Sequence, residues 1–377
     1  MLMTQTDRYS SHFGISQSAI KDFLNKSPKK WYDIWINKQQ DIDKNENGFV
    51  FGSLLDTLLF TPENLESKFC VMNEKLPSEA IESIIRCAYR RIKSQNNVDA
   101  SNLPEDLSWD LEDYSQIILE CANEYSTVKE GKEVKGWYNN LTQEVRIKKI
   151  KEQGDAYFQQ LLQCNDRKII SNSMNFEAIA SRDILYNHHL SKQYLTPTEG
   201  VELIFQLEIF ANHILKDGKT LPVKAALDIL KIDHQFKTLQ IVDFKTTYNA
   251  HHFIKSIKQY GYALQLSFYD YLLRLWLNQP EQEKYKDYEI LVPMNLVIDK
   301  YNIPYVYEYR WLDLQLEREG NFQYLFDLYQ TRDHNSKVKP GWEAILEEIG
   351  WHYHSDQWEI PKELFENKKI QVNLLNS

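Results

Sequence analysis

The stretch from residue 226 to residue 247 reads Ala-Leu-Asp-Ile-Leu-Lys-Ile-Asp-His-Gln-Phe-Lys-Thr-Leu-Gln-Ile-Val-Asp-Phe-Lys-Thr-Thr. Two short apolar runs flank a polar turn in this stretch, a pattern that predicts a β-hairpin. If the loop is centred on residues 234–237, Asp228 lies opposite Asp243. Because facing carboxylates repel each other, the pair should cost stability unless a divalent cation lies between them. The hairpin therefore predicts a metal site.

Lys245 follows Asp243 by two positions, so the two side chains point to the same face of a sheet. Carboxylate oxygens are ligands that suit Mg²⁺ or Mn²⁺. One or two such ions can polarise a phosphoryl group, activate a water and stabilise a leaving oxygen, as phosphodiester hydrolysis requires. Lys245 could orient or deprotonate that water, or neutralise charge that builds on phosphorus. The alternative is a surface hairpin that happens to carry these residues, because Asp-x-Lys is a common tripeptide.

Four further positions bear on this prediction. Gln265 and Tyr269 are spaced i, i+4 in an apolar helix predicted over residues 255–277, so they share one face; ordinary packing is the alternative. Asp56 lies in a largely apolar helix predicted over residues 51–60, where a carboxylate is costly to bury without a partner; a helix cap or a solvent-facing stripe is the alternative. Glu208, near the end of a predicted strand, is either an extra ligand or a surface residue.

The composition describes a folded chain with an acidic balance. Hydrophobic residues make up 42% and aromatic residues 13% of the 377 positions, enough for a packed core. No apolar run approaches the roughly 20 residues of a membrane span, and the first residues do not resemble a signal peptide, so we expect a cytoplasmic location without membrane contact. The net charge of −10 restricts any basic nucleic-acid surface to stretches such as 86–93 and 146–151, for which solvated helix faces are the alternative.

The cysteine spacing and two missing motifs argue against other kinds of site. Cys70, Cys87, Cys121 and Cys164 are widely scattered, without a Cys-x-x-Cys pair. This spacing argues against zinc or an iron–sulfur cluster and predicts reduced, mostly structural thiols. The sequence contains neither a Walker-type glycine-rich loop nor a Gly-x-Ser-x-Gly elbow, so neither ATP-driven helicase activity nor serine hydrolase chemistry is supported.

Helical patterns fill about the first 195 residues, and strand patterns begin after Pro197. Hydroxyl caps predict helices that begin after Ser16 and Ser27. Further strands are predicted over 201–210, 288–298 and 305–310, and a last helix over 313–331. Without an internal repeat or a linker, we expect a single domain over residues 1–377. A mainly helical part (1–195) would contribute Asp56, and residues 196–377 would form a catalytic α/β core.

Together these residues resemble the PD-(D/E)xK nuclease superfamily and, within it, the exodeoxyribonuclease VIII (RecE-type) and RecB-like group. The central likeness is Asp228, a 14-residue gap, the run Asp243-Phe244-Lys245, and then Gln265 and Tyr269. Weaker likenesses extend outward. The run 16–18 resembles the group's N-terminal segment, the run 51–56 resembles its Gly-x-x-x-His motif, and the runs 168–171 and 349–352 also look similar. Together they cover most of the chain.

The resemblance implies an α/β fold with a restriction-endonuclease-like core, in which helices flank a central mixed sheet, and with a helical N-terminal region. It also implies a role for each matching residue: metal ligation by Asp228, Asp243, the carbonyl of Phe244 and Asp56, catalysis by Lys245, and support of the site and the substrate phosphate by Gln265 and Tyr269. Two departures stand out. Leu227 replaces the usual proline before Asp228, and Asp56 replaces the usual histidine, which raises the negative charge of the site.

The activity that the resemblance implies is a Mg²⁺-dependent exonuclease, with Mn²⁺ as a substitute, that resects the ends of double-stranded DNA for recombination or repair. Relatives form homo-oligomeric rings and hand single strands to an annealing recombinase. A ring with an acidic exterior and a positive lumen would reconcile the net charge with DNA binding. Two alternatives stay open: an endonuclease on the same fold, and a catalytically inactive DNA-binding or structural protein. Asp56 favours the inactive protein, whereas the intact Asp228, Asp243 and Lys245 oppose it.

Overall fold

The computed structural model describes residues 9, 11–38, 50–96, 110–129, 132–164, 167–320 and 340–362. The chain divides into two compact units. The sheet unit comprises Met1–Asn45 and Asp183–Ser377, and the insert unit comprises Glu46–Arg182. The first 45 residues therefore belong to the sheet unit. The predicted boundary near residue 195, in contrast, places them in the helical part of the chain.

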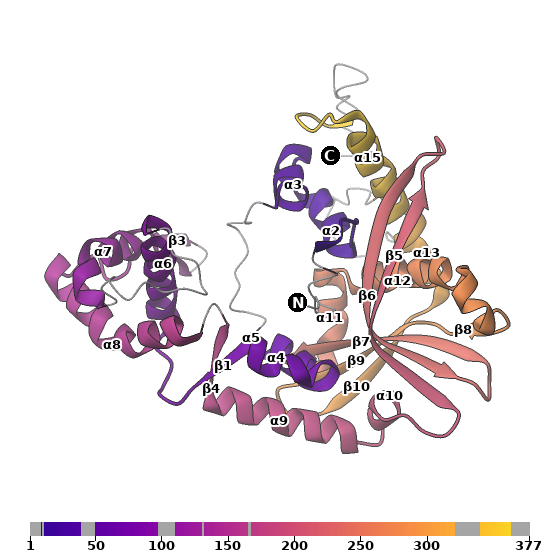
Figure 1. Ribbon diagram of the computed structural model, residues 1–377, viewed down its shortest axis with the longest axis horizontal. Coiled ribbons are helices and arrows are strands. Elements are labelled where there is room, and N and C mark those ends of the chain that lie inside the picture. Colours follow the sequence, from indigo (N-terminus) through magenta and orange to yellow (C-terminus); the bar gives the residue numbers. More distant parts are fainter. Residues whose placement is uncertain are drawn as a thin grey trace. The chain divides into compact units, whose positions relative to one another are not determined.

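The sheet unit is built on a six-stranded mixed sheet (Figure 1). The strand order is β10-β9-β7-β6-β5, and β8 pairs with β7 beside this path. Pairing is antiparallel for β5 with β6, β6 with β7 and β9 with β10, and parallel for β7 with β9 and with β8. The strands are β5 (Val201–Ile214), β6 (Thr220–Asp233), β7 (Thr238–Thr247), β8 (Glu289–Ile290), β9 (Met294–Asp299) and β10 (Pro304–Glu308). This arrangement confirms the predicted α/β class with a central mixed sheet.

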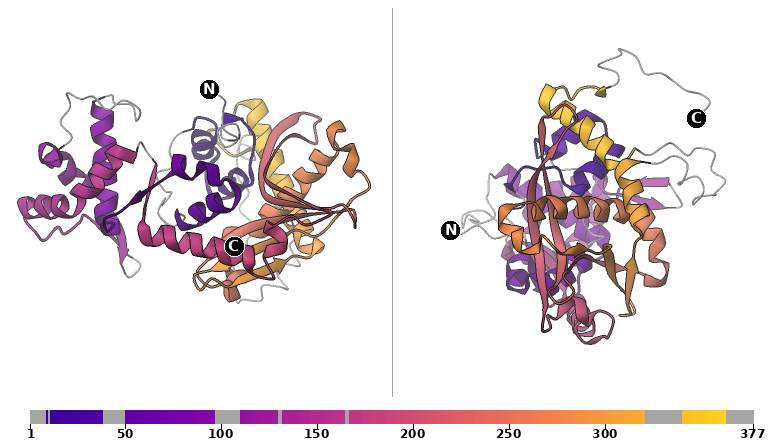
Figure 2. Two further views of the ribbon diagram at one scale, coloured as in Figure 1. Left: turned by 60° about the horizontal axis from the view of Figure 1, so that its bottom comes forward. Right: turned by 90° about the vertical axis from the view of Figure 1, so that its right-hand side faces the viewer.

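Helices cover the sheet (Figure 2), and its apolar side chains form a buried core with theirs. α12 packs on β5, β6 and β7, and α15 packs against β6, α2 and α13. The predicted caps are confirmed, since the hydroxyls of Ser16 and Ser27 accept hydrogen bonds from backbone N–H groups of α2 and α3. The helices are α2 (Gln17–Asn25), α3 (Pro28–Trp35), α10 (Lys192–Leu195), α11 (Phe253–Tyr260), α12 (Tyr262–Leu277), α13 (Trp311–Glu319) and α15 (Trp342–Ser355), with 3₁₀ segments η4 (Ala250–His252) and η5 (Pro280–Tyr285).

The hairpin has the register that the sequence predicts. Its ladder runs from Asp233 paired with Thr238 to Ile229 paired with Val242, so it stops one position before Asp228 and Asp243. From Val242 onward, β7 pairs in parallel with β9 on its other side. The two aspartates therefore lie where β6 and β7 stop pairing with each other.

The prediction of a single helix over residues 255–277 is wrong, because the helix breaks at Gly261. α11 ends at Tyr260 and α12 begins at Tyr262. Gly261 has a φ of 63° and a ψ of 43°, a left-handed conformation that strains residues with a Cβ atom. The glycine therefore lets the chain turn between two helices. The helix predicted over 313–331 is present as α13 up to Glu319, and its remaining positions from 321 lie outside the described residues.

The insert unit has its own hydrophobic core, formed mainly by α6, α7 and α8. Ile81, Ile85, Ile118 and Phe158 are fully buried in it. Among the residues that the structure describes, none of the helices combines the length and the apolar character that crossing a bilayer requires. The elements are α4 (Val50–Phe60), η2 (Pro62–Asn64), α5 (Leu65–Lys68), β1 (Phe69–Met72), α6 (Glu79–Gln95), η3 (Leu111–Tyr114), α7 (Ser115–Glu124), β2 (Ser126–Lys129), β3 (Lys132–Lys135), α8 (Gln143–Cys164) and β4 (Lys168–Ser171); α9 (Asn172–Asn187) continues into the sheet unit.

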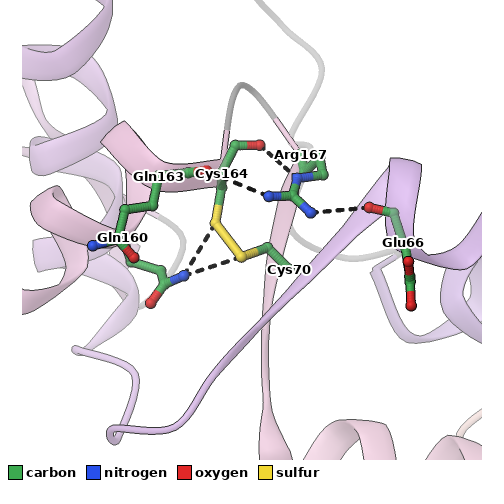
Figure 3. The surroundings of a disulfide bond; sticks show 6 residues. All are labelled: Glu66, Cys70, Gln160, Gln163, Cys164 and Arg167. Atoms are coloured by element: carbon green, nitrogen blue, oxygen red, sulfur yellow. Dashed lines mark hydrogen bonds between the residues drawn. A yellow bond between two sulfur atoms is a disulfide. The ribbon is translucent and has the colours of Figure 1, made fainter.

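All four cysteines are paired, so the prediction of reduced thiols is wrong for this structure. One disulfide joins Cys70 to Cys164 and the other joins Cys87 to Cys121. Figure 3 shows the first of them, with the side-chain amide of Gln160 directed at both sulfur atoms. The prediction failed because the partners are 94 and 34 residues apart, and only the folding of α6, α7, α8 and β1 brings them together.

We expect Gly261→Ala to lower the free energy of unfolding by about 1–2 kcal/mol, because alanine is strained in the left-handed conformation. A Cβ atom at this position would also lie 3.2 Å from Cδ of Lys21. Gly261→Asn should cost less, because asparagine tolerates this conformation better. Urea unfolding of the two variants measures the difference. Equal stability of Gly261→Ala and the unsubstituted protein would contradict the assigned backbone conformation.

We expect thiol titration of the denatured, unreduced protein to detect no free cysteine, and titration after reduction to detect all four. Reduction should destabilise the insert unit by a few kcal/mol, because each disulfide closes a long loop. Four reactive thiols before any reductant is added would show that the cysteines are not bonded.

Candidate active site

Asp243 is a buried carboxylate near the middle of β7. Only 1% of its surface is exposed, and its neighbour on β9 in the parallel ladder is Asn295. Burying an ionised carboxylate is very costly unless charges and hydrogen bonds compensate it. The surroundings of Asp243 should therefore supply donors from several directions.

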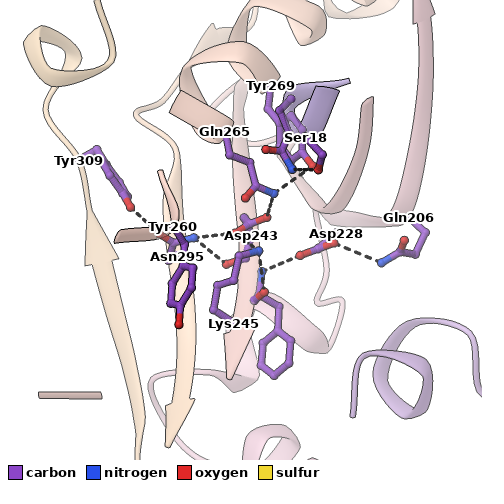
Figure 4. Close-up of polar contacts among 12 residues, drawn as sticks. Ser18, Gln206, Asp228, Asp243, Lys245, Tyr260, Gln265, Tyr269, Asn295 and Tyr309 are labelled. Atoms are coloured by element: carbon purple, nitrogen blue, oxygen red, sulfur yellow. Dashed lines mark hydrogen bonds and ion pairs between the residues drawn. The ribbon is translucent and has the colours of Figure 1, made fainter. Parts of the chain in front are cut away.

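Three side chains supply them (Figure 4). Gln265 Nε2, on α12, donates to Asp243 Oδ1 at 2.8 Å. Asn295 Nδ2, on β9, donates to Oδ2 at 2.7 Å. The ammonium of Lys245, on β7, lies 2.5 Å from the same Oδ2. Two neutral amides and one cation thus fix the carboxylate from two strands and a helix.

Lys245 is directed into this cluster. Its ammonium donates to the carbonyl oxygen of Phe244 at 3.1 Å and lies 5.2 Å from the ring centroid of Tyr262. Burial alone lowers the pKa of Lys245, but the charges of Asp243 and Asp228, with the hydrogen bond to Asp243, outweigh burial and raise that pKa above its ordinary value. In this structure Lys245 is therefore a cation.

Asp228 lies beside this cluster, one position beyond the end of the ladder of β6 with β7. Its Oδ2 accepts a hydrogen bond from the backbone N–H of Phe244 at 2.9 Å. On the other side it faces Gln206, the residue opposite it in the continuous register of β5 with β6, and Gln206 has a φ of 50°. Gln206 Nε2 lies 3.4 Å from Asp228 Oδ1. Left-handed backbone at a residue other than glycine is strained and is often found at functional sites.

A second layer of hydroxyls supports the two amides. Gln265 Nε2 also donates to the hydroxyl of Tyr269 at 3.0 Å, and the hydroxyl of Tyr309 donates to Asn295 Oδ1 at 2.6 Å. Burial, together with the nearby charge of Asp243, raises the pKa of both tyrosines, so both keep their hydroxyl protons: the hydroxyl of Tyr309 donates to Asn295, and the hydroxyl of Tyr269 accepts from Gln265. The amides are thereby fixed in the orientation in which their N–H groups face Asp243.

The donor set suits a hard divalent cation. The carboxylates of Asp228 and Asp243 and the carbonyl of Phe244 are all oxygen donors, and hydrogen bonds orient them. Among the described residues, no group of three or more His, Cys, Asp or Glu side chains could hold a metal. Mg²⁺ keeps several water ligands and commonly uses one or two carboxylates, so two aspartates and a carbonyl fit it.

Two other candidate ligands stay predictions. Asp56 is half-buried on α4, which belongs to the insert unit. Glu208 is half-buried on β5. Burial and the charge of Glu208 raise the pKa of Tyr9, whereas burial lowers the pKa of Lys224 against the opposing effect of Glu208. Glu208 therefore lies close to Tyr9 and Lys224.

The structure brings together five of the predicted side chains and adds others that the sequence analysis did not single out. Asp228, Asp243, Lys245, Gln265 and Tyr269 form one hydrogen-bonded cluster with the backbone of Phe244. The most important addition is Asn295. A polar residue inside the apolar run 294–298 is a signal that could have revealed it. The other additions are Gln206, Tyr262 and Tyr309.

Similarity to known proteins is found at the level of structure. No family model matches the chain, and no curated protein matches its sequence. A crystal structure from Eubacterium rectale, named "Putative exonuclease", covers 99% of this chain and 96% of its own, with 10% identity and a TM-score of 0.43. The crystal structure of SSO0001 covers 76% of this chain and 88% of its own, with 10% identity and a TM-score of 0.22. Both TM-scores are below 0.5, so neither likeness carries weight here.

We expect Asn295→Leu to lower the free energy of unfolding by roughly 2–3 kcal/mol, because leucine has the same branched arrangement of side-chain heavy atoms but leaves a buried carboxylate oxygen short of a donor. Tyr309→Phe removes only the outer hydrogen bond and should cost about 1 kcal/mol. Urea unfolding of both variants makes the comparison. A loss for Asn295→Leu no larger than that for Tyr309→Phe would show that Asp243 does not depend on this amide.

Proposed function

We propose that this protein is a metal-dependent deoxyribonuclease that hydrolyses phosphodiester bonds, and that it is an exonuclease acting at the ends of duplex DNA. The observation that carries the proposal is the buried carboxylate of Asp243, which contacts the ammonium of Lys245 and lies beside a second carboxylate, Asp228. Such a cluster costs stability, and a site that binds a metal and a phosphate accounts for it.

Each residue has a role in this chemistry. The carboxylates of Asp228 and Asp243 and the carbonyl of Phe244 would hold Mg²⁺ or Mn²⁺. The bound ion supplies polarisation of the phosphoryl group and acidification of a water. Gln265 and Asn295 hold Asp243 in place. Asp243 and the carbonyl of Phe244 take two of the three N–H donors of Lys245.

The third N–H of Lys245 can be directed to a water or to a phosphoryl oxygen. In the hydrolysis, the oxygen of water forms a bond to phosphorus and the bond from phosphorus to the leaving oxygen of the sugar breaks. One proton of the water goes to solvent and the leaving oxygen gains a proton. The ammonium of Lys245 stabilises the negative charge on the phosphoryl oxygens, and the hydrogen bond to Asp243 fixes its position.

The mode of cleavage and the assembly extend this proposal. Resected duplex ends would provide single strands for an annealing recombinase, and a homo-oligomeric ring with a positive lumen would allow an acidic chain to encircle DNA. An endonuclease with the same site is the second candidate. The intact cluster around Asp243 argues against an inactive DNA-binding protein, because a protein that does not cleave DNA gains nothing from a charged cluster that lowers its stability.

We expect linear duplex DNA labelled at the 5′ or the 3′ end to be degraded with Mg²⁺ or Mn²⁺ and to stay intact in EDTA. Asp243→Asn and Lys245→Ala should each lower the rate by about 100-fold or more, because the first weakens metal binding and the anchoring of Lys245, and the second removes the cation at the reacting phosphate. Gel electrophoresis of the labelled products measures the rates and shows from which end the strand shortens.

Asp217 and Lys219 provide matched controls, because they form an exposed ion pair in the turn between β5 and β6. Asp217→Asn and Lys219→Ala should retain full activity. Closed circular DNA should survive, and its cleavage would favour the endonuclease. Intact linear DNA with both metals, or activity that persists in Asp243→Asn and Lys245→Ala, would refute the proposed chemistry.

A further inference from the structure

Two tyrosines project into solvent just beyond the active-site strands. Tyr248 follows β7 and is 71% exposed, and Tyr301 follows β9 and is 62% exposed. Single exposed aromatic residues are common on protein surfaces, but neighbouring ones indicate a binding surface. Lys300 lies between these two rings. We call Tyr248, Lys300 and Tyr301 the tyrosine–lysine surface.

The fold brings the two tyrosines together through one buried carboxylate. Thr247 and Asp299 are paired at the last positions of the parallel strands β7 and β9. The segments that follow these strands therefore leave the sheet at the same end. Asp299 is 7% exposed. Its Oδ1 accepts hydrogen bonds from the backbone N–H groups of Tyr301 and Ile303, and its Oδ2 accepts one from Ala250. Asp299 thereby joins the two segments that carry the rings.

Lys300 places a positive charge on the two rings. Its Nζ lies 3.4 Å from the ring centroid of Tyr248 and 4.9 Å from that of Tyr301. A cation over an aromatic face is attracted by the electrons of the ring. The contact fixes the rings relative to each other and leaves most of their surface open to solvent.

The surrounding sequence has a local charge opposite to that of the whole chain. Residues 244–269 contain Lys245, Lys255 and Lys258 and neither Asp nor Glu, and Lys255 and Lys258 are exposed on α11. The basic stretches of the insert unit differ. There, Arg86 and Arg91 pair with glutamates of α6 and α7, as the alternative of solvated helix faces predicts. The segment that follows Asp243 thus carries lysines without acidic residues between them.

We propose that the tyrosine–lysine surface binds an unpaired segment of the nucleic-acid strand that the active site cuts, with bases stacked on Tyr248 and Tyr301 and a phosphate next to Lys300. This inference rests on the proposed nuclease function and specifies its substrate near the site. Aromatic rings interleaved with lysines are the usual means of binding single strands without sequence preference. Tyr248 lies three residues beyond Lys245, or about 10 Å along an extended strand, so a strand held there leads to the catalytic cluster.

The test measures fluorescence anisotropy with the full chain in EDTA, so that binding is separated from hydrolysis. The probes are a labelled oligothymidylate of ~12 nucleotides and an abasic strand of the same length. Oligothymidylate should bind more tightly. Tyr248→Ala and Tyr301→Ala should each weaken its binding by about ten-fold, because each removes one stacking ring, and should leave binding of the abasic strand nearly unchanged. Lys300→Gln should lower the slope of the logarithm of the binding constant against the logarithm of the salt concentration by the amount expected for about one phosphate contact.

Two kinds of control make the result decisive. Tyr248→Phe and Tyr301→Phe keep the rings and should bind like the unsubstituted protein. Phe236→Ala removes an aromatic residue that is 72% exposed in the turn at the other end of β7, and it should have no effect. Equal affinity for the two probes, or an equal loss in Phe236→Ala and Tyr248→Ala, would overturn the proposal. Because no metal is present, this outcome is distinct from a failure of the cleavage assay.

Discussion

The burial of the Asp243 carboxylate is the constraint on which this structure depends. A charge that is 1% exposed needs donors, and here they come from three elements: Lys245 on its own strand, Asn295 on β9 and Gln265 on α12. The parallel pairing of β7 with β9 places Asn295 beside it, and the turn at Gly261 starts a new helix that carries Gln265. The order of the strands and the break between α11 and α12 thus both bring hydrogen-bond donors to one buried carboxylate.

Local sequence patterns predicted much of this arrangement, but they did not predict the contacts between distant segments. The hairpin register follows from the period of two in its strands and from its turn, and the i, i+4 spacing of Gln265 and Tyr269 follows from a helix. The role of Asn295 as a donor to Asp243 could not be predicted, because it depends on β9 lying next to β7. The periodicity of the sequence does not specify which strands are neighbours. The cysteine pairs are as non-local, since their partners are 94 and 34 residues apart.

Charge is distributed to match these roles. The chain carries a net charge of −10, and Arg86 and Arg91 of the insert unit pair with glutamates on their own helix and on a neighbouring helix. In the sheet unit, residues 244–269, which begin in β7, carry lysines and exposed tyrosines without acidic residues. The overall acidity of the chain therefore says little about the charge near Asp243, because the local arrangement of side chains determines it.

The left-handed backbone of Gln206 has a consequence for stability. The register of β5 with β6 continues on both sides of Gln206 and Asp228, so the strained residue lies between two intact ladders. These ladders supply the free energy that keeps a residue with a Cβ atom in this conformation. The hydrophobic sheet thereby offsets the cost of a geometry that directs the side chain of Gln206 at Asp228.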